Sequence, residues 1–270
     1  MRIALIQTGS PTGEDAAARR ARVGRTLADL PTGIDLIVLP ELWAVGFHHF
    51  DDYTAEAEDL TGPTVRLCAD AARARQAWVL AGSIVERADG GRLRNTAVLL
   101  DPEGRVATTS SKIHIFGYAS REVELLSPGD TVSSAPTPFG RLGTTTCYDL
   151  RFPGLWNELV DAGAELVAVP AAWPAARLEH WRLLTTARAL DTQTFVIAVN
   201  SCGTQNGVAL GGHSRVVDPW GEVVAEAGAD EEVLIVDIDP ARVGRTRTEF
   251  PVLADRLTDY RPLRRTEVTA

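Results

Sequence analysis

Apolar positions along this chain of 270 residues follow two kinds of pattern. Apart from Asp35, residues 34–39 and 166–169 are apolar at every position. They predict strands covered on both faces, because a strand with one face in water alternates apolar and polar residues. Residues 14–30, 64–76 and 180–191 repeat apolar side chains every three or four positions, which predicts amphipathic helices. The predicted apolar faces are Ala16, Val23, Leu27 and Leu30 in the first helix, Val65, Cys68, Ala69 and Ala72 in the second, and Trp181, Leu184 and Leu190 in the third.

The two halves of the chain carry similar phrases in the same order. Residues 35–43 match residues 165–173, with an acid, an apolar stretch, a Pro and a Trp at equal spacing. An Asp-Pro-x-Gly phrase occurs in each half, at residues 101–104 and 218–221. Each phrase predicts a hairpin turn in which Gly takes a positive φ. The predicted hairpins join residues 96–100 to 105–109 and residues 214–217 to 222–226.

Each half therefore predicts a strand, a helix, a strand, a helix and a hairpin, with internal repeats at about residues 1–111 and 140–239. Helices cover one apolar face of each predicted sheet, and the other repeat covers the second face. The fold predicted is an α/β four-layer α-β-β-α sandwich with two pseudo-symmetric halves. Residues 1–270 are expected to form a single domain, with a C-terminal arm at residues 240–270 outside both repeats.

Composition narrows the function classes. The net charge of −9 argues against a nucleic-acid partner, which usually requires a basic surplus. No apolar run reaches the roughly 20 residues that span a bilayer, and the N-terminus leads directly into a strand, so we expect a cytoplasmic protein with no membrane partner. Three cysteines without paired spacing predict neither a disulfide framework nor a metal site, and no cofactor is indicated. Residues 241–270 contain seven Arg and four acidic residues, and this excess of Arg favours a subunit contact.

Three chemically active side chains come at the ends of predicted buried strands, where sites of such sheets collect. Glu41 follows the first apolar run, Cys147 ends the strand over residues 141–147, and Lys112 closes the strand after the first turn. Lys112 is the single Lys among 27 cationic residues, and an ammonium is a compact charge where Arg is a wide planar fork. The second repeat has Ala171 at the position of Glu41, so the fold itself requires no acid there.

These three side chains predict a nucleophilic site. A thiol attacks after a base has taken its proton, and a neighbouring cation stabilises first the thiolate and then the oxyanion formed at a carbonyl. Glu41 is the expected base, Lys112 the cation and Cys147 the nucleophile. A helix through Trp156 and Leu159 is predicted to follow Cys147, so the thiol is expected to gain from a helix N-terminus.

Other candidates keep two interpretations. Cys68 lies on an apolar helix face and is assigned to the core. Cys202 follows a buried strand and either packs in its turn or lines the same pocket. Glu122 and Glu124 are equivalent by pattern, since each is either a surface acid or a second carboxylate near Lys112.

The histidines and tryptophans near these positions are less specific. His48, His49 and His114 are interpreted as structural residues, and Trp43 and Trp173 as pocket walls or core. A serine hydrolase is disfavoured because the chain has no G-x-S-x-G phrase.

Three motifs resemble those of the nitrilase superfamily of carbon-nitrogen hydrolases. They are Leu-Pro-Glu-Leu-Trp around Glu41, Ser-Lys-Ile-His-Ile-Phe around Lys112, and Thr-Cys-Tyr-Asp-Leu-Arg-Phe-Pro around Cys147. The similarity covers nearly the whole chain. It implies a Glu-Lys-Cys triad, with Glu122 as the supporting second carboxylate and the backbone N–H of Tyr148 as an oxyanion donor. It also implies the sandwich fold and a homodimer or higher homo-oligomer with crossing C-terminal arms.

The motif Trp-Pro-Ala-Ala-Arg, from Trp173 to Arg177, is similar to the omega-amidase branch of that superfamily. This resemblance implies a small-molecule amide substrate that bears a carboxylate, such as 2-oxoglutaramate, with release of ammonia through a Cys thioester. Arg177 is the candidate partner for that carboxylate, whereas Arg151 either shares this role or pairs with a neighbouring acid.

Three alternatives stay open. Relatives in the omega-amidase branch often carry Asn-Arg where this chain has Asn200-Ser-Cys-Gly, a departure that leaves room for an N-carbamoyl or a deaminated-glutathione-type amide. A catalytically silent binding module is the alternative from another class, and it predicts loss of one of the three motif residues, none of which is lost.

Overall fold

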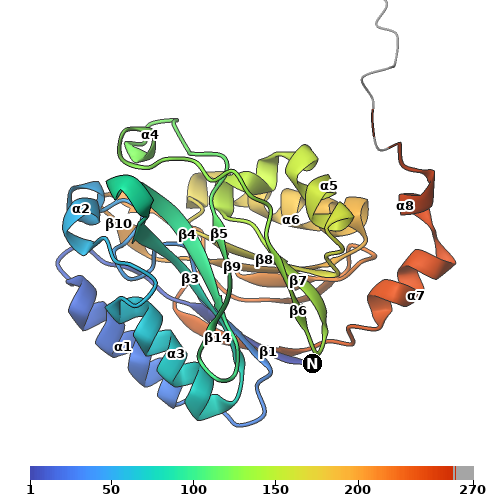
Figure 1. Ribbon diagram of the computed structural model, residues 1–270, viewed down its shortest axis with the longest axis horizontal. Helices are drawn as coiled ribbons and strands as arrows, with labels where there is room; N and C mark the ends of the chain where they lie inside the picture. Colours follow the sequence, from blue (N-terminus) through green and yellow to red (C-terminus); the bar gives the residue numbers. More distant parts are fainter. Residues whose placement is uncertain (258, 260–270) are drawn as a thin grey trace, which may run out of the picture.

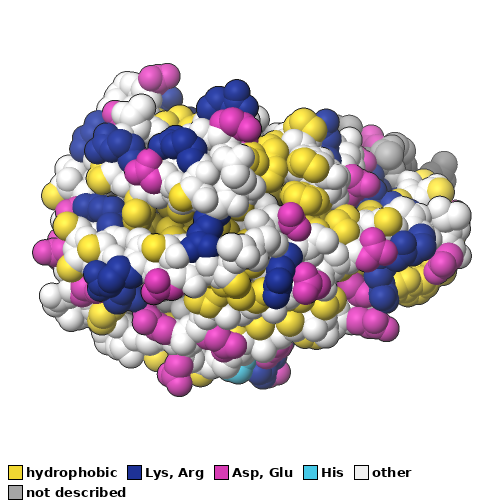
Figure 2. Space-filling view, turned by 90° about the horizontal axis from the view of Figure 1, so that it is seen from below, with side chains coloured by type: hydrophobic (Ala, Val, Ile, Leu, Met, Phe, Trp, Pro, Cys, Tyr) yellow, Lys and Arg dark blue, Asp and Glu magenta, His cyan; other side chains and the backbone are white. Residues whose placement is uncertain are grey.

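The computed structural model describes residues 1–257 and residue 259. Two six-stranded sheets lie face to face, with α1 and α3 outside the first sheet and α5 and α6 outside the second (Figure 1). The predicted four-layer α-β-β-α arrangement is therefore the one observed. On the face shown in Figure 2, cationic and acidic side chains are interspersed.

The first sheet has the strand order β14-β1-β2-β3-β4-β5. Strands β1, β2 and β3 are parallel to one another, and the remaining pairings are antiparallel. The strands are β1 (Arg2–Gln7), β2 (Leu36–Val38), β3 (Trp78–Arg87), β4 (Leu93–Leu100), β5 (Val106–Ser111) and β14 (Glu232–Asp237).

The second sheet has the order β13-β12-β9-β8-β7-β6, with β7, β8 and β9 parallel. Its strands are β6 (Ser134–Thr137), β7 (Gly140–Thr144), β8 (Leu166–Ala171), β9 (Phe195–Asn200), β12 (Arg215–Val217) and β13 (Val223–Glu226). A short separate hairpin is formed by β10 (Thr204–Gln205) and β11 (Val208–Ala209).

The predicted helices are observed as α1, α3, α5 and α6, with small shifts at their ends, whereas α2, α4, α7 and α8 were not predicted. The α-helices are α1 (Ala16–Ala28), α2 (Tyr53–Glu56), α3 (Pro63–Arg75), α4 (Glu122–Leu125), α5 (Pro153–Asp161), α6 (Leu178–Thr192), α7 (Arg242–Glu249) and α8 (Val252–Asp255). Four 3-10 segments are η1 (Phe50–Asp52), η2 (Asp89–Gly91), η3 (Cys147–Arg151) and η4 (Ala175–Arg177).

Alternate residues of each strand contribute to different core layers. In β8, Leu166 and Ala168 pack between the two sheets, whereas Val167 and Val169 pack against α5 and α6. Both faces of these strands are therefore covered, which explains their continuous apolar sequence. The predicted apolar faces of α1 and α3 are buried in the layer outside the first sheet, Cys68 included.

The sequence pattern missed two features of this arrangement. Each sheet has an edge strand from outside its own repeat: β14 lies in the second repeat but pairs with β1, and β6 precedes residue 140 but pairs with β7. The expected apolar face of α6 is also wrong at Leu190, which is 46% exposed, although Trp181 is buried.

The two Asp-Pro-x-Gly turns are confirmed. Asp101 Oδ1 accepts the N–H groups of Glu103 and Arg105, and Gly104 has a φ of +73°. In the second half, Asp218 Oδ1 accepts two N–H groups in the same way and Gly221 has a φ of +76°. The duplicated phrase thus produces a duplicated turn.

The arginines of the C-terminal arm that are described interact with this chain. Arg242 pairs with Asp218 at 2.6 Å, Arg245 pairs with Asp239, and Arg256 pairs with Asp161. Arg261, Arg264 and Arg265 of the same predicted arm lie outside the described residues. No helix in residues 1–257 combines the length and apolarity needed to cross a membrane.

Candidate active site

Three strand ends meet at one edge of the sandwich. Glu41 comes shortly after β2, Lys112 follows β5 directly, and Cys147 opens η3 beyond β7. All three side chains are buried, with Glu41 at 0%, Lys112 at 1% and Cys147 at 7% exposure. The strand-end positions proposed from the sequence are thus brought together.

Cys147 adopts an uncommon backbone conformation. Its strand ends at Thr144, three residues earlier than predicted, and its φ of +47° lies in the left-handed region that non-glycine residues rarely occupy. The predicted α-helix follows only at Pro153, so Cys147 lies in the first turn of the 3-10 segment η3 instead. Strain of this kind persists where the surrounding structure fixes it, and it commonly marks functional positions.

Lys112 lies between two carboxylates. Its Nζ is 2.8 Å from Glu41 Oε1 and 2.9 Å from each oxygen of Glu122. Glu122 is fully buried, whereas Glu124 is exposed and pairs with Arg121, so the structure separates these two acids. The backbone N–H of Phe116 donates to Glu122 Oε2. Glu122 therefore holds Lys112 in place.

The second half of the chain contributes to the same cluster. The backbone N–H of Ala172, just past β8, donates to Glu41 Oε2 at 2.9 Å. The Glu41 carboxylate also raises the pKa of the Cys147 thiol, because the two groups interact within the same buried cluster. Glu41 is therefore positioned both to hold Lys112 and to accept the proton of Cys147.

Burial and the two acids determine the electrostatics. Burial by itself lowers the pKa of Lys112, but Glu41 and Glu122 raise it above its ordinary value, so the ammonium stays charged. Burial and Glu41 raise the pKa of Cys147 well above its ordinary value, and Lys112 only partly opposes them. The expected stabilisation of a free thiolate by Lys112 is thus outweighed, and Cys147 needs a base at the moment of attack.

Asp149 ties the segment after Lys112 to the turn after Cys147. Its Oδ1 accepts the N–H of His114 at 2.8 Å and faces His114 Nδ1 at 2.7 Å, and its Oδ2 accepts the N–H of Thr146. The His114 ring also stacks on Phe152 at 3.6 Å. The structural interpretation of His114 agrees with this geometry.

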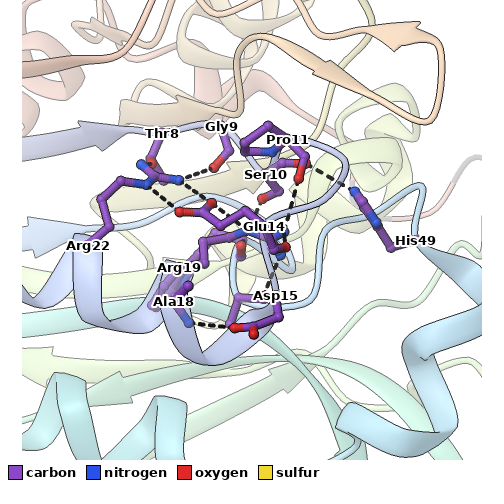
Figure 3. Close-up of polar contacts among 12 residues, drawn as sticks. Thr8, Gly9, Ser10, Pro11, Glu14, Asp15, Ala18, Arg19, Arg22 and His49 are labelled. Carbon is purple, nitrogen blue, oxygen red and sulfur yellow. Dashed lines mark hydrogen bonds and ion pairs between the residues drawn. The ribbon is translucent and has the colours of Figure 1, made fainter.

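A second polar network braces the segment after Glu41 (Figure 3). Ser10 Oγ donates to Trp43 O, Arg19 Nη1 donates to Ala44 O, and His49 Nε2 contacts Ser10 O at 3.0 Å. Arg19, although charged, is only 1% exposed. This network holds the backbone that carries Glu41, and it agrees with a structural role for His49.

A cavity opens over Cys147, with about 360 Å³ of space including its open mouth. Tyr148, Trp173 and Arg177, the three predicted substrate-binding residues, all line it. Trp43 is instead core, with its Nε1 donating to Ala81 O, so the two tryptophans differ in role. The full lining is Phe47, His48, Phe116, Cys147, Tyr148, Arg151, Ala172, Trp173, Pro174 and Arg177.

Two guanidinium groups in this lining have no carboxylate partner among residues 1–257. Arg151 lies 4.7 Å from the centre of the Trp173 ring and contacts His180, and Arg177 lies 5.6 Å from the centre of the Phe116 ring. The alternative that Arg151 pairs with a neighbouring acid is therefore wrong. Guanidinium groups are good partners for carboxylates, so these two are available to bind an anionic group.

Cys202 is separate from this cavity. It is buried beside Gly9, Arg22 and Glu231 at another surface depression, and burial raises the pKa of its thiol to about 12. The interpretation as turn packing agrees with this position.

Three residues of the site were missed or misassigned from the sequence: Asn95, Asp149 and His48. Asn95 is a buried amide beside both carboxylates, and a polar residue inside the apolar run of β4 was the available signal. His48 lines the cavity, so the interpretation as loop packing was incomplete. Burial, with His49 and Arg177 nearby, lowers its pKa to about 4 and keeps it neutral at physiological pH. Within the described residues, no cluster of three or more His, Cys, Asp or Glu is arranged to hold a metal ion.

Comparisons with known proteins agree with this geometry. A family model described as carbon-nitrogen hydrolase matches residues 2–248. The chain is 38% identical over 248 residues to a 2-oxoglutaramate amidase of Paenarthrobacter nicotinovorans, a match that covers 88% of this chain and 84% of that protein.

Solved structures show the same fold. Nit3 of Saccharomyces cerevisiae, a member of the nitrilase superfamily, aligns with a TM-score of 0.83 at 29% identity over 97% of both chains. A mutant amidase of Nesterenkonia sp., in which acrylamide has added to the active-site cysteine, aligns with a TM-score of 0.78 at 25% identity, over 94% of this chain and 99% of that chain. The resemblance seen in the three motifs is confirmed.

Proposed function

Because the chain belongs to the carbon-nitrogen hydrolase family and is a hydrolase of non-peptide carbon–nitrogen bonds, we propose that it is an amidase of the omega-amidase type. It removes ammonia from the amide of a small substrate that also bears a carboxylate, such as 2-oxoglutaramate. The observation that carries this proposal is the pair Arg151 and Arg177, which line the cavity over Cys147 and have no carboxylate partner in residues 1–257.

The proposed mechanism begins with proton transfer from Cys147 to Glu41, because the raised pKa of the thiol keeps it protonated beforehand. The sulfur attacks the amide carbon, and the resulting oxyanion is held by Lys112 Nζ and the N–H of Tyr148. The N–H groups in the first turn of a helix have no partner within that helix, which leaves Tyr148 N–H able to donate.

Lys112 must exchange one contact during this step. Its ammonium has three N–H groups and contacts three carboxylate oxygens, one on Glu41 and two on Glu122. We expect one contact to Glu122 to be replaced by the oxyanion. Glu41 then returns its proton to the departing ammonia and removes a proton from the water that hydrolyses the thioester.

The test is ammonia release from 2-oxoglutaramate and from a neutral amide of similar length, in the wild type and in Arg177→Leu. A charge-assisted hydrogen bond contributes about 1.5–3 kcal/mol, so we expect kcat/KM for 2-oxoglutaramate to fall by about 10–100-fold in the variant. The neutral amide should be affected by less than about threefold, since it has no carboxylate to lose a partner.

Activity with other substrates, or the absence of any activity, would contradict this proposal. Preference for an N-carbamoyl compound or for a deaminated-glutathione-type amide would replace the proposed substrate. Ammonia release from none of these, together with no acyl adduct on Cys147 by intact mass, would favour the silent binding module. The departure at Ser201 and Cys202 does not alter the lining of the catalytic cavity, which contains neither residue.

We also propose that the protein acts as a homodimer in the cytoplasm. Support for a dimer comes from an exposed apolar face beside α6, where Leu183 is 68% exposed and Leu190 contacts the segment of Trp220, which stacks on Phe250. Such faces are commonly covered by a partner. Light scattering after gel filtration should give twice the mass of one chain, and the Leu183→Glu variant should have the mass of a single chain.

The proposed cytoplasmic location is supported by the three cysteines, which are all free, as is usual in a reducing compartment.

A further inference from the structure

The two carboxylates beside Lys112 share a second donor that none of the three motifs contains. Asn95, in β4, is 0% exposed, and its Nδ2 lies 2.8 Å from Glu41 Oε1 and 3.2 Å from Glu122 Oε1. The backbone carbonyl oxygen of Asn95 accepts the backbone N–H of Lys112 at 2.8 Å. Asn95 therefore contacts all three charged members of the cluster.

In the side-chain amide of Asn95, only the nitrogen Nδ2 forms hydrogen bonds. Its Oδ1 is buried and has no hydrogen-bond partner among the described residues, although buried polar atoms are usually paired. Both acceptors of Nδ2 are carboxylate oxygens. The amide is thus oriented by the negative charges that it faces.

Charge balance explains what this donor does. One ammonium, Lys112, faces two buried carboxyl groups, and burial raises the pKa of Glu122, so ionisation of both groups requires a further donor. An amide N–H stabilises a buried carboxylate without adding a charge that would also favour the thiolate. Asn95 thus supports ionised Glu41 and Glu122 while leaving the net charge of the cluster unchanged.

The contacts also distinguish the two oxygens of Glu41. Oε1 accepts from both Lys112 Nζ and Asn95 Nδ2, whereas Oε2 accepts from the N–H of Ala172. A carboxylate oxygen has about two lone-pair directions, so Oε1 is occupied and Oε2 keeps one free.

We propose that Asn95 is a positioning residue that fixes Glu41 so that Oε2 receives the Cys147 proton, and that it keeps the two carboxylates ionised. In this step the S–H bond breaks, the proton passes to Glu41 Oε2, and the sulfur electron pair forms the new bond to carbon. The proposal rests on the roles of Glu41 and Cys147 given above, but not on the identity of the amide substrate.

The test measures alkylation of Cys147 by iodoacetamide against pH, with intact mass and peptide mapping as the readout. Iodide leaves as sulfur bonds to the methylene carbon, so the test requires no cleavage of a carbon–nitrogen bond. In Asn95→Leu we expect a rate at least about tenfold lower at pH 7. We also expect the acidic midpoint of the profile to lie about one pH unit higher, because a buried carboxylate that loses a donor holds its proton to higher pH.

The titratable groups that face this cluster are few. They are Glu41, Lys112, Glu122, Cys147, Tyr53 and His48. Among these groups only the carboxylates of Glu41 and Glu122 contact Asn95 Nδ2. A change in the acidic midpoint of the alkylation profile in the Asn95 variants is therefore attributed to these two carboxylates.

Thr96→Val is the matched control. Thr96 is the next residue of β4 and equally buried, and its Oγ1 donates to Glu86 Oε2 at 2.6 Å, away from the cluster. Its alkylation profile should match the wild type. If Asn95→Leu does not fold, Asn95→Ser should show a smaller displacement in the same direction.

A wild-type midpoint in both Asn95 variants overturns the proposal, and so does a rate that falls equally at every pH. Failure of the substrate proposal has a different signature. In that case ammonia release from 2-oxoglutaramate is absent, while the alkylation midpoint still moves in Asn95→Leu.

Discussion

The ends of β2 and β8 occupy equivalent places in the two halves, yet they carry different chemistry. After β2, Glu41 is fully buried among Lys112, Asn95 and Cys147. The equivalent Ala171, at the end of β8, is equally buried but lies in an apolar cluster. The same backbone position therefore tolerates a carboxylate in one half and a methyl group in the other.

The difference shows that the acid is held by its surroundings and not by the strand. A buried carboxylate is costly unless it is paired and hydrogen-bonded, and Glu41 receives donors from Lys112, Asn95 and the N–H of Ala172. The last donor comes from the second half. The two halves thus specialise: one supplies the base, and the other supplies the nucleophile and a backbone donor.

Replacing the acid should have the largest effect. Glu41→Gln keeps the shape of the side chain but removes the proton acceptor, and general-base catalysis contributes about 10²–10⁴-fold. We expect kcat for ammonia release to fall by about 10³-fold. The counterpart Ala171→Ser should change kcat by less than about fivefold, and comparable losses in both variants would contradict the specialisation of the halves.

The second largest effect is expected for replacement of Lys112, the cation that contacts both Glu41 and Glu122. In Lys112→Arg the charge is kept, but a guanidinium does not fit between Glu41 and Glu122 in a site with no exposed surface. Loss of one oxyanion donor costs about 10²–10³-fold in kcat, so we expect a fall of at least about 10². A near-normal kcat in this variant would remove Lys112 from the proposed mechanism.

The two tryptophans sharpen the comparison further. Trp43 is 0% exposed in the core of the first half, whereas Trp173 lines the cavity and supports the Arg151 guanidinium. Trp43→Phe should lower the free energy of unfolding by about 1–3 kcal/mol, since it removes buried volume and the bond to Ala81 O, with little change in KM. Trp173→Phe should raise KM severalfold. Urea unfolding and steady-state kinetics on both variants check this, and exchanged outcomes would be inconsistent with it.

Much of this architecture was predictable because it depends on local sequence. Continuous apolar runs, helical periodicity and the repeated turn phrase identified the layers, and strand-end positions identified Glu41 and Lys112. Asn95 depends instead on strand register. A β-bulge between Leu99 and Leu100 shifts the β4–β5 register by one residue, so counting from the turn would place Arg94 opposite Lys112. The pairing of β14 with β1 could not be predicted from the sequence pattern either, because the pattern of an edge strand does not specify which sheet it joins.

The smallest effects are expected at the duplicated turns, where both halves keep the same Asp. Asp218 is nearly fully buried and binds Arg242 as well as two N–H groups, whereas Asp101 pairs with the exposed Arg105. Asp218→Ala should therefore lower the free energy of unfolding by about 1–3 kcal/mol, and Asp101→Ala by about 0.5–1 kcal/mol.

The pH dependence of the Asp101 effect has a defined sign. Slight burial raises the pKa of Asp101, but hydrogen bonds from the backbone of Arg105 and its guanidinium outweigh this and lower it below the usual 3.8. A lowered folded-state pKa stabilises the protein above the unfolded value, and this contribution is lost as the pH falls through the folded value. The destabilisation in Asp101→Ala should thus be present at pH 7 and shrink below about pH 4, as followed by urea unfolding at several pH values. Equal destabilisation by both Asp variants at pH 7 would show that the ion pair with Arg242 adds nothing to the second turn.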